Sequence, residues 1–137
     1  ASVDQTQGKP DSAKGLDINL EVTLQSATMS APQIISRSNM KHLYWSMEQM
    51  LAHHTVTGCN MRTGDMCGTG TISGPTEDSY GSILELTWRG EKPIALPNGD
   101  TRKFLQDGDT VTMKGYCQGD GYRVGFGEVT GKILPAK

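Results

Sequence analysis

Three hydroxyl side chains stand at alternate positions of one short segment. Residues 68–75 read GTGTISGP, and in an extended strand Thr69, Thr71 and Ser73 would lie on one face. Hydroxyls in a row can hydrogen-bond a carboxylate or an enolate oxygen, and small neighbours let a ligand approach the backbone. Cross-strand or local hydrogen bonds are the other use of such hydroxyls. On the sequence alone we favour that second use.

Glu85 is the only carboxylate of the segment SILELTW, residues 82–88, which we predict to be a strand. Alternation places Leu84, Leu86 and Trp88 on its apolar face and Glu85 on the other face. If that face is half buried, the carboxylate could orient a histidine or accept its proton. If it is wet, Glu85 is a surface acid. The sequence leaves both interpretations open.

Other polar residues fit structural roles better than catalytic ones. His53 and His54 end a predicted helix, where the helix dipole favours an imidazolium. His54 also continues the apolar stripe of that helix, so we predict a core histidine. Lys114 and Arg123 could pair with an acidic ligand, but exposed strand charge is the interpretation that we favour.

The elements that must position these residues begin with a strand over residues 16–24, where apolar and polar side chains alternate strictly. A short strand over 33–36 follows. Apolar side chains at three- and four-residue steps then predict a helix from about Ser38, as its N-cap, to about His54. Trp45 falls on the polar side of that helix, which indicates a second packing surface there.

The rest of the chain is predicted to be mainly β. Expected strands cover residues 66–73, 82–88, 94–96, 110–116, 122–126 and 128–134, with tight turns at 98–99, 107–108 and 119–121. The fold class is therefore mainly β with one helix. Residues 16–137 form one domain, and residues 1–15 are expected to be a polar loop or a cut end.

Composition excludes several classes of protein. Thirteen Lys and Arg against 15 Asp and Glu give a formal charge of -2, which lacks the basic excess that nucleic-acid binding needs. No apolar run approaches the roughly 18 to 20 residues of a membrane span. Cys59, Cys67 and Cys117 are an odd, sparse set, which favours a reducing, cytoplasmic compartment. Their spacing does not suit a zinc site.

Several long strings of this sequence closely resemble the C-terminal region of eukaryotic-type fumarylacetoacetases. They are LAHHTVTGCNMRTGD, GTGTISGP, SYGSILELTWRG, RKFLQDGD and GYCQGDGYRVGFGEVTGKILPA. The resemblance covers nearly everything from Leu16 onward, in the same order. Two small departures fall in turns: Thr63 stands where the family usually has proline, and Thr76 where it usually has glutamate.

The resemblance implies a mixed β-sandwich roll and a homodimer. It also implies hydrolysis of a carbon–carbon bond in a β-diketone, giving fumarate and acetoacetate in tyrosine and phenylalanine catabolism. In the family, a histidine held by a glutamate activates water, a divalent cation (Mg or Ca) bound by carboxylates polarises the diketone oxygens, and a lysine helps stabilise the carbanion. Glu85 matches that glutamate, and Thr71 matches a threonine that contacts the substrate.

The family's histidine, metal-binding acids and lysine lie upstream of the region that this chain matches. We therefore expect the last third of an enzyme, inactive alone, whose site is completed by a missing N-terminal part or a companion chain. The alternative is a catalytically inactive β-domain that serves as a binding or dimerisation module. An acylpyruvate hydrolase of the same superfamily fits less well, because those shorter relatives do not usually carry residues 92–120 in this form.

Overall fold

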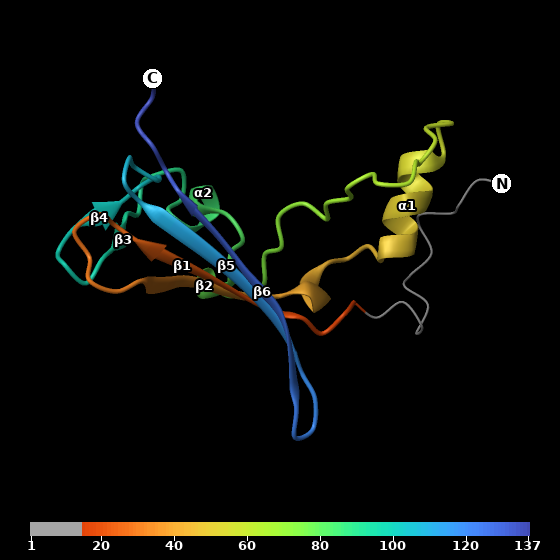
Figure 1. The fold of residues 1–137 in the computed structure, drawn as a ribbon, viewed down its shortest axis with the longest axis horizontal. Helices are drawn as coiled ribbons and strands as arrows, with labels where there is room; N and C mark the ends of the chain where they lie inside the picture. Colours follow the sequence, from red (N-terminus) through yellow and green to blue (C-terminus); the bar gives the residue numbers. More distant parts are fainter. Residues whose placement is uncertain (1–14) are drawn as a thin grey trace.

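A four-stranded antiparallel sheet forms the body of the molecule in the computed structural model, which describes residues 15–137. The strand order is β2-β1-β5-β6 (Figure 1), and a two-stranded sheet of β3 and β4 lies beside one end. The strands are β1 (Asn19–Gln25), β2 (Gln33–Asn39), β3 (Ile94–Ala95), β4 (Thr101–Arg102), β5 (Thr110–Gln118) and β6 (Arg123–Lys132). The predicted class, mainly β with one main helix, is confirmed. The predicted polar segment 1–15 lies, apart from Gly15, outside the described residues.

Strand β1 confirms the strongest prediction of the sequence. It pairs with β2 on one side and β5 on the other, so it is one of the two inner strands of this sheet. Its register with β2 shifts between Val22 and Thr23, and Thr23 and Leu24 are both buried, so both faces are covered at this end. Leu24 forms the small core with Met29 and Leu96. The core therefore sits where the main sheet meets β3.

The predicted helix is shorter than the sequence indicated. Strand β2 runs on to Asn39, so Ser38 is a strand residue and not an N-cap. A 3-10 turn, η2 (Met40–His42), follows, and the extended backbone of Leu43 ends it. Helix α1 (Met47–Thr55) begins only at Ser46, whose hydroxyl accepts the backbone N–H of Gln49 at 3.3 Å while the Gln49 side chain accepts the Ser46 N–H at 2.9 Å. This capping box fixes the start of the helix.

Trp45 lies in the linker that joins η2 to α1 and not within a helix. It is 39% exposed and meets the ring of Tyr44 edge-on, with 4.8 Å between the centroids. Helix α1 itself lies away from the sheet (Figure 1). A second packing surface for Trp45 stays a prediction.

The predicted strand over residues 82–88 is wrong. The segment forms a single helical turn, α2 (Ile83–Leu86), preceded by the 3-10 turn η3 (Glu77–Ser79). The hydroxyl of the buried Thr87 donates to the carbonyl of Ile83 at 2.8 Å, and Trp88 then adopts a φ of 49° that no strand allows. Leu84 and Trp88, expected on a buried face, are about half exposed. Their alternation with polar residues does not reflect a pleated strand.

Two further strand predictions need correction. Residues 66–73 are not assigned to a strand, and Gly70, at a φ of 77°, breaks the alternation. The two strands expected over 122–126 and 128–134 are the single strand β6, which absorbs a register shift opposite Gly115 with Gly127 at a φ of 82°. The β5–β6 hairpin projects from the body (Figure 1), and its reversal at residues 119–121 is confirmed.

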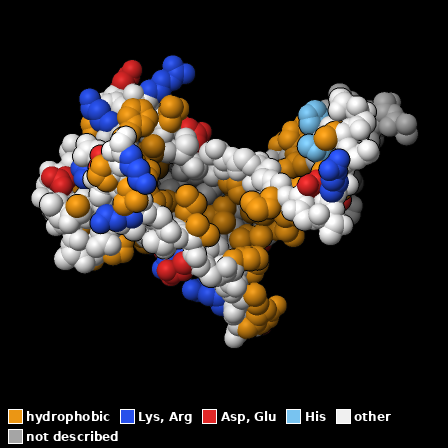
Figure 2. Space-filling model, turned by 45° about the horizontal axis from the view of Figure 1, so that its top comes forward, with side chains coloured by type: hydrophobic (Ala, Val, Ile, Leu, Met, Phe, Trp, Pro, Cys, Tyr) orange, Lys and Arg blue, Asp and Glu red, His pale blue; other side chains and the backbone are white. Residues whose placement is uncertain are grey.

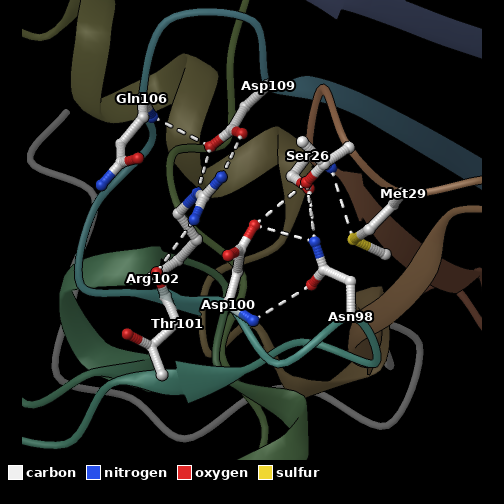
Figure 3. Close-up of polar contacts among 9 residues, drawn as sticks. Ser26, Met29, Asn98, Asp100, Thr101, Arg102, Gln106 and Asp109 are labelled. Carbon is white, nitrogen blue, oxygen red and sulfur yellow. Dashed lines mark hydrogen bonds and ion pairs between the residues drawn. The ribbon is translucent and has the colours of Figure 1, made fainter.

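A buried ion pair joins β4 to the start of β5 (Figure 3). Arg102 donates two hydrogen bonds to the carboxylate of Asp109, at 2.9 and 3.0 Å, and the backbone N–H of Gln106 adds a third at 2.9 Å. Burial opposes ionisation of Asp109, but the bonds from Arg102 and Gln106 outweigh it and lower its pKa. Bidentate pairing of this kind orders the loop between β4 and β5.

Hydrophobic side chains remain exposed over much of the described surface. Figure 2 shows them across the middle of the face in view and on the projection formed by the β5–β6 hairpin, which carries Tyr122, Val124 and Phe126. Each of these three side chains is more than half exposed. None of the helices in residues 15–137 is long and apolar enough to cross a membrane.

Candidate functional site

An open cavity of about 550 Å³ brings together three parts of the chain. The linker after β2, the extended segment 66–73 and helix α2 each contribute to its wall. Its lining combines hydroxyl, imidazole and carboxylate groups with apolar side chains, namely His42, Leu43, Tyr44, Thr71, Ser73, Ser82, Leu84 and Glu85. Both residues that the sequence singled out, Glu85 and Thr71, therefore face the same cavity.

Two serine hydroxyls hold Glu85. Its Oε2 accepts hydrogen bonds from Ser73 Oγ at 2.8 Å and from Ser82 Oγ at 3.0 Å. The side chain is half-buried, which answers the question that the sequence left open. Since both hydroxyls donate, the carboxylate acts as an acceptor. It is thus preorganised to take a further donor from a ligand or another side chain.

Thr71 lies on the extended segment, two residues before Ser73, and is exposed to the cavity. Gly81 packs closely behind it, since a Cβ at position 81 would stand 2.7 Å from Thr71 Cγ2. The third hydroxyl of the expected row, Thr69, lines a different cavity beside α1. The positive φ of Gly70 turns the segment between Thr69 and Thr71, so only Thr71 and Ser73 come together.

The remaining candidates lie elsewhere. His53 and His54 are exposed at the end of α1, and His54 Nε2 is 3.4 Å from Cys59 Sγ, so the prediction of a core histidine at 54 is wrong. Lys114 pairs with Glu128 at 2.8 Å. Arg123 stacks over the Tyr116 ring at 4.1 Å. Both cations are exposed on strands, as the favoured interpretation predicted, and each has a protein partner.

Sequence reasoning missed two polar residues of the cavity, Ser82 and His42. Ser82 precedes Glu85 by three residues, and its hydroxyl accepts the Glu85 backbone N–H at 3.3 Å as an N-cap. A Ser-x-x-Glu pattern is a helix-start signal, so the sequence contained this information. His42 ends η2, and no local pattern places it beside residues about thirty positions later.

Comparison with known proteins gives this cavity its context. A family model described as fumarylacetoacetate (FAA) hydrolase, C-terminal, matches residues 5–133, nearly the whole chain. The chain belongs to this fumarylacetoacetate hydrolase family. The match includes the segment of Thr71 and Ser73 as well as the helix of Glu85.

Several relatives of this family member are fumarylacetoacetases. The chain is 59% identical over 120 residues to that of Homo sapiens, 57% over 122 residues to that of Dictyostelium discoideum, and 59% over 120 residues to that of Arabidopsis thaliana. Each match covers 88% of this chain but only 28% or 29% of the relative. The chain thus spans less than a third of the length of these fumarylacetoacetases.

The divalent cation that the family resemblance implies, Mg or Ca, would need several oxygen ligands, carboxylates above all. Within residues 15–137, no three His, Cys, Asp or Glu side chains gather as such a site requires. The described residues of this fumarylacetoacetate hydrolase chain therefore do not fit a metal by themselves.

Proposed function

We propose that this chain is the C-terminal part of a fumarylacetoacetase. In the complete protein, the reaction is hydrolysis of fumarylacetoacetate to fumarate and acetoacetate, a step of tyrosine and phenylalanine catabolism. Water adds its oxygen to the carbonyl carbon on the fumaryl side, the adjacent carbon–carbon bond breaks, and a proton completes acetoacetate. The observation that carries the proposal is the meeting of Glu85 and Thr71 in one cavity of a chain about 58% identical to fumarylacetoacetases.

Glu85 is assigned the role of a positioning residue for a histidine that activates the attacking water. A carboxylate that accepts an imidazole N–H fixes the tautomer of the ring and stabilises the imidazolium that forms. Hydrogen bonds from Ser73 and Ser82 support this role because they hold the Glu85 carboxylate as an acceptor at the cavity wall. The histidine itself belongs to the part of the protein beyond this chain.

Thr71 is assigned to the substrate. Its side chain is exposed to the cavity, and its segment is tied to Glu85 through Ser73. A hydroxyl there can donate to a carboxylate or diketone oxygen of a small β-diketone. The family's Mg or Ca ion would be held by carboxylates outside this chain.

The partners of this chain follow from the same proposal. The missing N-terminal part of the enzyme, or a companion chain, supplies the histidine, the lysine and the metal ligands. The complete protein acts as a cytoplasmic homodimer. Exposed hydrophobic side chains, such as Trp45 and Phe126, give this assembly apolar surface to bury.

The test is an assay of the complete protein and of the 137-residue chain with fumarylacetoacetate, with and without Mg or Ca. We expect the complete protein to release fumarate and acetoacetate and to lose activity on chelation. The chain alone should have no turnover above that of a Glu85→Ala control. An inactive complete protein that still binds itself or a partner through this chain would instead support a binding or dimerisation module.

A further inference from the structure

We propose that Ser73 and Ser82 are positioning residues that act together on Glu85, so that one carboxylate oxygen is held and the other faces the reaction. This inference rests on the proposed function, because it gives the two serines a role in the same reaction. Both serines line the cavity of Glu85 and act through its carboxylate. The hydroxyl protons of the two serines hold the Glu85 carboxylate in its active orientation, in addition to any contribution that the serines make to folding.

The direction of each hydrogen bond supports this role. Ser73 Oγ accepts the backbone N–H of Gly81 at 3.0 Å, and Ser82 Oγ accepts the backbone N–H of Glu85 at 3.3 Å. A hydroxyl has a single proton to donate. With an accepted backbone bond orienting each oxygen, that proton is directed to Glu85 Oε2, at 2.8 Å from Ser73 and 3.0 Å from Ser82.

The arrangement distinguishes the two oxygens of the carboxylate. Oε2 accepts both serine hydroxyls, whereas Oε1 has no hydrogen-bond partner among residues 15–137. Oε1 is therefore the oxygen available to an imidazole N–H supplied by the rest of the protein. Holding a flexible glutamate in one orientation also removes an entropy cost from the step that uses it.

The two serines come from different elements, which makes the arrangement more than a helix cap. Ser82 is the N-cap of α2, so a bond to Glu85 three residues later is local. Ser73 lies twelve residues before Glu85, on the segment that carries Thr71. Capping alone would not require Ser73. Its bond links the substrate-facing segment to the carboxylate.

The experiment uses the complete protein, with kcat and KM measured for Ser73→Ala and Ser82→Ala. Each substitution should lower kcat roughly 10- to 100-fold, because each removes a hydrogen bond to a charged group, while KM changes less than about threefold. Ser82→Thr, which keeps both hydroxyl and cap, should restore kcat.

Two controls separate positioning from folding. Ser36 is a buried serine whose hydroxyl donates to the carbonyl of Tyr80 at 2.7 Å, so Ser36→Ala should lower thermal stability and leave kcat close to that of wild type. In a Glu85→Ala background, Ser73→Ala should cause no further loss of kcat, because it acts through Glu85.

The contrary outcomes are distinct. If Glu85→Gln lowers kcat but both serine-to-alanine variants keep the wild-type kcat, this inference is overturned and the proposed function stands. Full additivity of Ser73→Ala with Glu85→Ala would overturn it as well. If the complete protein does not hydrolyse fumarylacetoacetate, or Glu85→Gln keeps full kcat, the proposed function and this inference both fail.

Discussion

Ser73 and Glu85, twelve residues apart, are joined by a 2.8 Å hydrogen bond from Ser73 Oγ to Glu85 Oε2. Neither residue lies in the strand that the sequence predicted for it. The bond ties an extended segment without strand pairing to a single helical turn. Side-chain hydrogen bonds, and not strand pairing, therefore hold this wall of the cavity together. Small shifts of the backbone here should change the geometry of the site.

Gly81→Ala should disturb the candidate site. A Cβ at position 81 would collide with the carbonyl oxygen of Ile72 and stand 2.7 Å from Thr71 Cγ2. Backbone cannot yield as a flexible side chain can, so the segment of Thr71 and Ser73 has to shift. We expect kcat/KM of the complete protein to fall at least about 10-fold, since an error near 1 Å at a site can cost about 100-fold.

Gly68→Ala is the matched control for that substitution. Gly68 lies on the same segment, and its added Cβ would meet nothing within 4 Å. Its kcat/KM should stay within about twofold of wild type, since surface substitutions are usually worth less than about 0.5 kcal/mol. Equal kinetics for the two variants would show that the packing of Gly81 does not matter for the site.

Asp109→Ala should be among the most destabilising single changes in this chain. It leaves Arg102, 8% exposed, without its carboxylate. Removing one partner of a buried ion pair costs about 3 to 5 kcal/mol of the free energy of unfolding. Glu21→Ala, which breaks the exposed 3.3 Å pair with Arg37, should cost less than about 1 kcal/mol. Urea unfolding of both variants checks this difference, and similar costs would refute it.

The same ion pair predicts a pH dependence. The pKa of Asp109 in the folded chain lies below its ordinary value of 3.8. A lowered pKa stabilises the fold at pH above the unfolded value, and this stabilisation is lost as pH falls through the folded value. The stability difference between wild type and Asp109→Ala should therefore be constant above about pH 5 and shrink below pH 4. A difference as large at pH 2.5 as at pH 7 would contradict the assignment.

Thr71→Val should weaken substrate binding more than it slows the chemical step. The substitution keeps the shape of the side chain and removes the hydroxyl that faces the cavity. A substrate oxygen left without its donor costs about 1 to 3 kcal/mol, or roughly 5- to 150-fold in KM. Steady-state kinetics of the complete protein measure it. An unchanged KM would leave Thr71 with a structural role only.

Some of this fold could be predicted from the sequence because it depends on long, regular patterns. Strict alternation over residues 16–24 predicted β1, and the glycine-rich turn at residues 119–121 predicted the reversal between β5 and β6. The strand prediction for residues 82–88 failed because seven alternating residues are as compatible with a strand as with a capped helical turn. Only the Ser82 N-cap and the positive φ of Trp88 separate the two structures.

The residues of the candidate site also include some that the sequence predicts and some that it does not. Glu85 and Thr71 were identified in the sequence through the family resemblance, although both were placed on strands that do not exist. His42 could not be found, because it reaches the cavity through tertiary folding after β2. The positive φ of Gly70 also decides which hydroxyl groups lie together. Because glycine adopts either sign of φ, the sequence does not predict this turn.

The most direct test of the account is the kinetics of Glu85→Gln in the complete protein with fumarylacetoacetate. The substitution keeps the size of the side chain and replaces the charged acceptor by an amide. Because an orienting carboxylate acts mainly in the transition state, kcat should fall about 100- to 10,000-fold while KM changes little. A Glu85→Gln enzyme with the kcat of wild type would contradict the account and leave Glu85 as a capped helix residue.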